Sequence, residues 1–112
     1  MSKKEIQTEL KRNNKTEINI KTQAIIQNNI IKYIENNIIN IVDLKEEKIT
    51  RRTKEYIIIL DLKKETIINK FKNNEILLKI KVLNKKIEQR NIEIEYQIIE
   101  TNDQIKYKLN WK

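Results

Sequence analysis

The sequence predicts an all-β fold, an antiparallel up-and-down β-barrel of about eight to ten short strands. Along most of the chain, apolar and polar residues alternate with a period of two, which is the pattern of half-buried strands. The chain has no glycine and no proline, yet the pair Asn-Asn recurs between isoleucine-rich runs, at 13–14, 28–29, 36–37 and 73–74. Asparagine tolerates the left-handed backbone region that tight hairpins require, so we expect these pairs to form the turns.

The first two strands are expected at 4–11 and 15–27, on either side of the first asparagine pair. In the first strand, Ile6, Thr8 and Leu10 fall on one face, while polar and charged residues fall on the other. The second strand repeats the alternation, with these residues on one face: Ile18, Ile20, Thr22, Ala24 and Ile26. Each strand therefore has one face for the core and one for solvent.

The segment 24–42 allows two interpretations. As β-structure, it gives short strands at 30–35 and 38–45, separated by the pair at 36–37. As an amphipathic helix, it has isoleucines at spacings of three and four, namely Ile26, Ile30, Ile34, Ile38 and Ile41. We favour strands, because the segment contains five asparagines and many β-branched residues, which are mediocre helix formers.

The middle of the chain is expected to hold a strand beginning near Lys48 and another at 56–62. Both faces of the second strand are apolar, since Ile57 and Ile59 lie opposite its main apolar face, and this predicts burial on both sides. The segment 63–72 stays open between one or two turns of helix and a strand. As a strand, it would align three residues on one face: Ile67, Asn69 and Phe71.

The C-terminal third shows the clearest alternation, with strands expected at 76–83, 91–101 and 104–112 and a turn at 101–104. The middle strand places four residues inward, namely Ile92, Ile94, Tyr96 and Ile98. The strands on either side of it each carry four residues on one face, Ile76, Leu78, Ile80 and Val82 in the first and Ile105, Tyr107, Leu109 and Trp111 in the last. The outward faces carry opposite charges that can pair across the ladder, Glu93 and Glu95 with Lys106 and Lys108. Such pairs favour one register of the two strands.

Composition bounds the chemistry. The 112 residues suggest a single domain, 1–112, with a core built mainly from 25 isoleucines. Cysteine and histidine are absent, which excludes disulfides, thiolate metal sites and imidazole base catalysis. The only aspartates, Asp43, Asp61 and Asp103, are widely separated, and a hydrolase with a carboxylate pair ranks last among the functions considered. We therefore expect a protein that is not an enzyme and uses no cofactor and no metal.

We expect neither a signal peptide nor a membrane-spanning segment in this sequence. Its first ten residues lack the apolar core of a signal peptide. The longest apolar run, 57–60, is far too short to span a bilayer. We expect a cytoplasmic protein without a membrane partner.

The net charge of +8 comes mainly from 20 lysines spread along the whole chain, against four arginines. We interpret most of these lysines as solvated residues of the outer faces and edges. The alternative is a basic β-domain that binds nucleic acid through lysine-rich faces. We expect the aromatic residues in the core, and only Tyr107 and Trp111, which lie between lysines, come near a base-stacking platform.

Three stretches resemble the YwiB-like family of uncharacterised bacterial proteins. The run 30–35 is similar to a family strand of the form Y-x-x-Y-x-E, matched by Tyr33 and Glu35. The run 48–53 is similar to a strand ending apolar-x-Arg-x-Gly, with Arg51 as the arginine and Thr53 where glycine is expected. The run 71–81 looks like the family's aromatic-Gly turn with its following strand, with asparagine replacing glycine, and the last two strands also suit the family's ending. The resemblance implies a calycin/lipocalin-like barrel in a bacterial cell, and it implies no reaction.

The candidate ligand-binding residues are Arg51, Tyr33 and Glu35. Arg51 and Arg52 are adjacent on a strand, so their side chains point to opposite faces, and one of them can point into the barrel. An inward arginine near Glu35 and Tyr33 would form a polar centre able to hold a carboxylate or phosphate. The alternative is an internal ion pair, or a plug at the barrel mouth, with no ligand.

These observations together predict a non-enzymatic barrel that binds an unknown small ligand or a protein partner in or at the barrel. The runner-up is the nucleic-acid-binding domain described above. Small barrels with exposed edges often pair, so a homodimer is a further option. The interior of the barrel distinguishes these functions. A cavity with Arg51 in its wall favours ligand binding, whereas an interior filled by side chains favours interactions at the surface.

Overall fold

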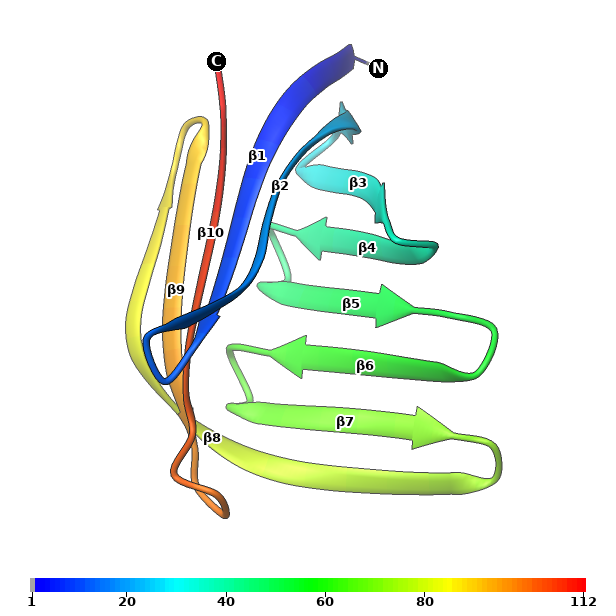
Figure 1. The fold of residues 1–112 in the computed structure, drawn as a ribbon, viewed down its shortest axis with the longest axis vertical. Helices are drawn as coiled ribbons and strands as arrows, with labels where there is room; N and C mark the ends of the chain where they lie inside the picture. Colours follow the sequence, from blue (N-terminus) through cyan, green and yellow to red (C-terminus); the bar gives the residue numbers. More distant parts are fainter. Residues whose placement is uncertain (1) are drawn as a thin grey trace.

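The computed structural model describes residues 2–112, and all the regular structure in that range is β-strand (Figure 1). The ten strands are β1 (Ser2–Arg12), β2 (Lys15–Gln27), β3 (Ile30–Glu35), β4 (Ile38–Asp43), β5 (Lys48–Arg52), β6 (Tyr56–Asp61), β7 (Thr66–Phe71), β8 (Asn74–Glu88), β9 (Asn91–Ile98) and β10 (Gln104–Trp111). Each strand pairs antiparallel with its neighbours in the chain, and β10 pairs with β1 to close a barrel. The prediction of an all-β, up-and-down barrel is confirmed.

Asparagine pairs make three of the hairpin turns, as predicted. In the pairs at 13–14, 28–29 and 36–37, φ lies between 48° and 68° at both residues. Two consecutive positive φ values characterise the two-residue turn whose twist matches that of the flanking strands. The prediction for 73–74 is wrong by one residue, because Phe71 pairs with Asn74 and the positive φ, 53°, falls on Lys72.

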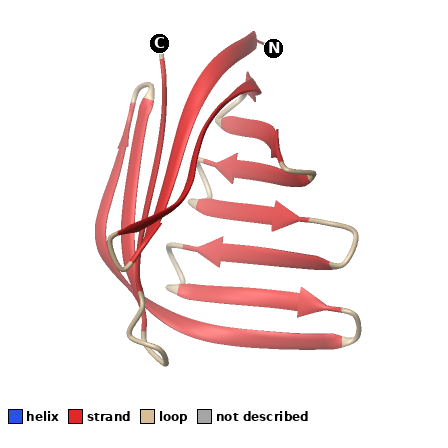
Figure 2. Ribbon diagram, viewed as in Figure 1, coloured by secondary structure: helices blue, strands red, loops and turns tan. Residues whose placement is uncertain are grey.

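The two ambiguous segments are strands. Residues 24–42 form the end of β2, then β3 and β4, so the helical alternative is wrong. Alternation places Ile31, Tyr33 and Glu35 inside the barrel and leaves Ile34 58% exposed on the outer face. The segment 63–72 contains β7, and Figure 2 shows strands and loops without helix across residues 2–112. In β7, Ile67 is buried and Asn69 is half-buried.

Apolar side chains of β6 occupy both faces, as the sequence suggested, but burial is unequal. Leu60 is buried inside the barrel. Ile57 and Ile59 lie on the outer face and are half-buried. On that face Ile59 stands opposite Ile68 of β7, and the two side chains shield each other from solvent. Among residues 2–112, no further sheet or helix packs over them.

Two long strands turn the corners of the barrel. β8 runs to Glu88, beyond the predicted end at Leu83, and its register shifts between Val82 and Asn84. Its first half pairs with β7 and its second half with β9. β2 pairs with β1 along most of its length but with β3 only over Ala24–Gln27. In Figure 1, the strands β3 to β7 consequently run across the direction of β1, β9 and β10.

The inward faces predicted for the last strands are confirmed. In β9, Ile92, Ile94, Tyr96 and Ile98 are buried, and in β10 Ile105, Tyr107 and Leu109 are buried. The predicted register also holds, since Glu95 stands opposite Lys106 and Glu93 opposite Lys108. The Lys108 Nζ atom lies 3.9 Å from Glu93 Oε1.

The described residues include no helix long and apolar enough to cross a membrane.

Candidate functional site

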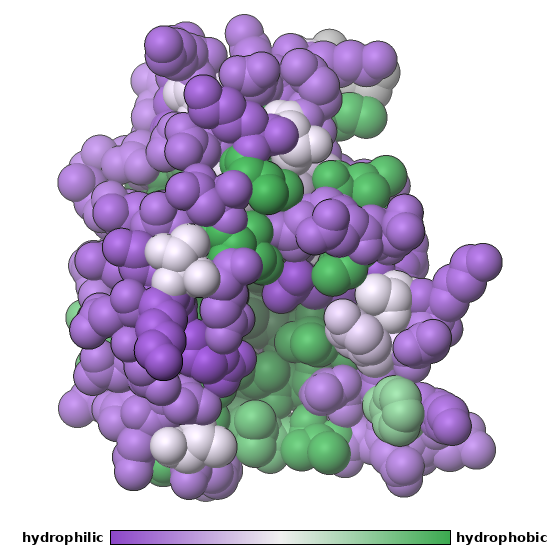
Figure 3. Space-filling view, in the orientation of Figure 1, coloured by the Kyte–Doolittle hydropathy of each residue, from purple (hydrophilic) through white to green (hydrophobic). Residues whose placement is uncertain are grey.

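The barrel encloses a cavity of about 350 Å³. Its mouth lies beside the β1–β2 and β9–β10 turns, where Arg12, Glu17, Thr101 and Asp103 line it. Figure 3 shows a hollow in this face of the molecule, with hydrophobic residues exposed inside it. Ligand-binding cavities commonly have volumes of about 300–1,000 Å³, so the space suits a small molecule.

Strand register builds a polar row across the cavity wall. Tyr33 of β3 stands opposite Asn40 of β4, which stands opposite Arg51 of β5. The same row continues through Ile58 of β6 to Asn69 of β7. Because directly opposed residues share a face, these five side chains form one belt around part of the lumen.

An apolar row lies one step deeper in the barrel. Ile49, Leu60, Ile67 and Leu78 are opposed in sequence on β5, β6, β7 and β8, and all four line the cavity. The two rows differ in chemistry because strand positions two residues apart point to the same face. A molecule in the cavity would therefore meet an apolar floor and a polar belt above it.

Arg51 and Glu35 form an ion pair at the belt. The Arg51 Nη2 atom donates a hydrogen bond to Glu35 Oε1 at 3.0 Å, with side-chain exposures of 28% and 3% respectively. Arg52 is exposed, on the opposite face of β5. The internal ion pair that the sequence offered as an alternative is thus present, and it lies in the wall of a cavity.

Two tyrosines join their hydroxyl groups across the lumen. The Tyr33 and Tyr107 hydroxyl oxygens are 2.8 Å apart, and both residues are buried. Burial raises the pKa of Tyr33 to about 12 and that of Tyr107 well above its ordinary value. Both phenols are therefore protonated at neutral pH and available as hydrogen-bonding groups. Since Tyr107 points inward, it does not form a platform among the exterior lysines.

Two buried oxygens of the wall have no hydrogen-bond partner within residues 2–112. They are the Oγ1 atom of Thr8, a residue only 1% exposed, and the Oδ1 atom of Asn69. Both residues line the cavity. Buried polar atoms are nearly always satisfied in folded proteins, so these two oxygens mark places where a bound molecule could donate hydrogen bonds.

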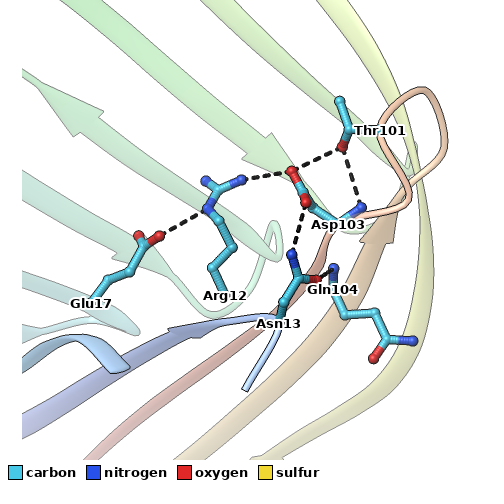
Figure 4. A network of polar contacts seen from close by, with 6 residues as sticks. All are labelled: Arg12, Asn13, Glu17, Thr101, Asp103 and Gln104. Atoms are coloured by element: carbon cyan, nitrogen blue, oxygen red, sulfur yellow. Dashed lines mark hydrogen bonds and ion pairs between the residues drawn. The ribbon is translucent and has the colours of Figure 1, made fainter. Parts of the chain in front are cut away.

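A network of polar contacts frames the mouth (Figure 4). Asp103 accepts hydrogen bonds from Asn13 Nδ2 at 2.9 Å and from Arg12 Nη1 at 3.0 Å. Asn13 and Gln104 exchange two further bonds, at 2.8 and 2.9 Å. The hydrogen bond from Asn13, followed by that from Thr101, lowers the pKa of Asp103, so its carboxylate stays charged.

Glu17 reaches the mouth because of a β-bulge. Leu10 pairs with Ile18 and Lys11 with Thr16, so Glu17 has no opposite residue on β1. A bulge redirects a side chain that regular alternation would send outward. The Glu17 carboxylate accepts a hydrogen bond from Arg12 Nε at 2.9 Å. Arg12 therefore lies between two carboxylates.

The structure brings the three candidate residues Arg51, Tyr33 and Glu35 to one region of the cavity wall. Sequence reasoning missed the roles of Asn40 and Asn69, because the polar row depends on the pairing of five strands. It also missed the mouth network, in which residues about 90 positions apart in the chain meet. The other two aspartates shape turns, since Asp43 and Asp61 accept hydrogen bonds from backbone amides that follow them.

Among residues 2–112, no three acidic side chains gather closely enough to hold a metal ion.

Comparison of the chain with protein-family models, with curated proteins and with solved structures finds no match.

Proposed function

We propose that this protein binds a small, largely apolar molecule inside its barrel. The observation that carries the proposal is the cavity of about 350 Å³, which has an apolar floor, a belt containing Tyr33 and Arg51, and Glu35 paired with Arg51. Concave, mostly apolar sites with a few placed polar groups are the usual form of small-molecule sites.

Binding without catalysis is part of the proposal. Arg51 and Glu35 hydrogen-bond to each other, as do the Tyr33 and Tyr107 hydroxyl groups, and the raised pKa values of the two tyrosines keep these phenols protonated. No nucleophile is placed beside a base in this arrangement, which a covalent reaction would need. A cytoplasmic setting and kinship with the YwiB-like proteins complete the proposal, supported by the sequence features and the resemblance given above.

The test uses the neutral fluorescent probe N-phenyl-1-naphthylamine, whose emission rises in apolar surroundings. We expect saturable binding to the wild type and binding weakened by about tenfold or more in Leu78→Trp, because the indole ring occupies the cavity. The matched control is Leu77→Trp, at the neighbouring position, where the side chain is 51% exposed.

Circular dichroism of each variant establishes that the fold is retained. Absence of saturable probe binding to the wild type would refute the proposal. Equal loss of binding in Leu77→Trp and Leu78→Trp would also refute it, because the probe would then lie on the surface.

A second candidate function, nucleic-acid binding, is supported by the segregation of charge. The residues lining the cavity include two arginines and four carboxylates, whereas the whole chain carries +8, so the positive charge lies on the outside. Binding of a labelled single-stranded DNA that weakens by about tenfold or more for each threefold rise in salt would support this function. No binding at low salt would eliminate it.

A further inference from the structure

The charges around the cavity disfavour an anionic ligand. At the level of the belt, the cavity holds one ion pair, Arg51 with Glu35, which is neutral as a unit. At the mouth, the Arg12 guanidinium contacts two carboxylates, Glu17 at 2.9 Å and Asp103 at 3.0 Å. A negative group entering the cavity would pass more carboxylates than arginines, whereas a positive group would be attracted.

The Arg51–Glu35 pair is itself a poor receptor for an anion. If a ligand carboxylate displaced Glu35 from Arg51, the Glu35 side chain, 3% exposed, would remain as a buried charge without a partner. If the ligand carboxylate joined the pair instead, it would add negative charge to a lining that already holds four carboxylates against two arginines, whereas an ammonium group would offset part of that excess. Neutral oxygen atoms of a ligand avoid both costs, because Arg51 can donate to them while keeping Glu35.

The unpartnered oxygen of Asn69 favours a ligand that donates hydrogen bonds. Thr8 and Asn69 come from β1 and β7, which are four strands apart around the ten-stranded ring, so the two oxygens approach the lumen from different sides. The Asn69 Oδ1 atom can only accept a hydrogen bond. An N–H or O–H group on the ligand would satisfy it, whereas a carboxylate at neutral pH has no donor to offer.

We propose, on the basis of the function proposed above, that the cavity takes a small amphiphile with an apolar body and an uncharged or cationic head that donates hydrogen bonds. Alkyl amines and alkyl alcohols represent this class, and the corresponding carboxylates are rejected. The apolar body lies on the floor made by Ile49, Leu60, Ile67 and Leu78, and the head lies at the belt.

Displacement of bound N-phenyl-1-naphthylamine by three molecules with the same eight-carbon chain tests the inference. At pH 7, octylamine and octan-1-ol should displace the probe at concentrations lower by about tenfold or more than octanoate. The net charge of +8 would by itself attract octanoate. A preference for the amine therefore cannot come from the overall charge of the protein.

Two substitutions test the role of the unpartnered oxygens. Thr8→Val and Asn69→Leu should each weaken the binding of octan-1-ol and octylamine by about fivefold, as the loss of one hydrogen bond predicts, and Asn69→Leu should leave octanoate binding unchanged. Lys70→Leu is the matched control, because Lys70 neighbours Asn69 on the outer face of β7 and is exposed. Thr8→Val nearly preserves side-chain shape, so it keeps the test valid if Asn69→Leu fails to fold.

A third experiment removes one negative charge, that of Glu17, from the mouth of the cavity. In Glu17→Gln, the ratio of amine affinity to alcohol affinity should fall by about threefold. Octanoate binding as tightly as octylamine would overturn the inference while leaving the proposed function intact. Unchanged alcohol and amine affinities in both folded oxygen variants would also overturn it. Failure of the probe itself to bind would instead remove the proposed function.

Discussion

At the scale of single residues, the barrel depends on left-handed backbone positions that are filled without glycine. Eleven of the described residues have positive φ, and seven of them are asparagines. The other four are Glu47, Glu65, Lys72 and Arg90. A left-handed backbone conformation lowers stability by about 1–2 kcal/mol for a residue other than glycine. The cost is smaller for asparagine, because its side-chain amide can hydrogen-bond to the nearby backbone. The four charged residues therefore store strain that the asparagines largely avoid.

Substitutions at two turns should have opposite effects on stability. Lys72→Gly should raise the free energy of unfolding by about 1 kcal/mol, because glycine adopts φ of 53° without a steric cost. Asn28→Ala should lower it by about 1 kcal/mol, since alanine at φ of 51° has neither glycine's freedom nor asparagine's amide. Urea unfolding followed by circular dichroism measures both changes.

The control for this pair is Lys70→Gly, within β7, which should destabilise because glycine weakens a strand interior. If Lys72→Gly destabilised the protein as much as Lys70→Gly does, the turn at Lys72 would not be strained.

At the scale of the elements, the β9–β10 hairpin shows how a sequence pattern specifies register. The inner faces of its two strands are apolar and the outer faces carry opposite charges. Both features favour the same register of the two strands. A slip by one residue would move every isoleucine to the outside. For this reason the sequence alone predicted which residues stand opposite one another in this hairpin.

A double-mutant cycle that exchanges the charges of Glu93 and Lys108 should show that the two side chains interact. Glu93→Lys should lower the free energy of unfolding by about 0.2–1 kcal/mol, because it places two lysines opposite each other. Lys108→Glu should do the same by creating a pair of glutamates. The double variant Glu93→Lys with Lys108→Glu should recover most of the loss. Thermal unfolding in low salt measures the cycle, and strictly additive losses would show that the two residues do not interact.

Elements without such agreement were harder to predict. The stretch 84–88 has lysines and one isoleucine but no alternating run, so nothing in the sequence indicates that β8 continues through a bulge to reach β9. The turn at 72–73 was misplaced because asparagine prefers turns, whereas the pairing of Phe71 with Asn74 is decided by the whole β7–β8 ladder. Local preference was outweighed by tertiary pairing in both cases.

At the scale of the whole molecule, the cavity shows what the sequence could and could not indicate. Alternation indicated that Tyr33 and Glu35 share a face and that one of Arg51 and Arg52 can point inward, and the family resemblance singled out Arg51. The volume left between strands depends on closure of all ten, which no local pattern encodes. Likewise, Asp103 was indicated only as part of a turn, and its partners Arg12 and Asn13 come from the other end of the chain.

Acid should weaken the network that joins the first and last hairpins. The lowered pKa of Asp103 means that its charged form stabilises the fold at pH values above its ordinary pKa of 3.8, and that this contribution is lost as the pH falls through the lowered folded value. Asp103→Asn should therefore be less stable than the wild type at pH 6, and the difference should shrink toward pH 2. Urea midpoints across that range measure it.

Glu100→Gln serves as the control, because it removes an exposed carboxylate from the same turn without touching the network. A difference between wild type and Asp103→Asn that stayed constant from pH 6 to pH 2 would contradict the assignment.

The first part of β1 and the end of β10 lie side by side, at the end of the barrel away from its mouth (Figure 1). Ile6 pairs with Trp111, and β1 continues from Ile6 for six more residues to Arg12 at the mouth, a length of about 20 Å. A fusion partner or a surface tether joined to either end would thus project away from the opening (Figure 1). Molecules immobilised through the C-terminus would present their entrances to the solution, in a uniform orientation suited to recording ligand capture on a sensor chip.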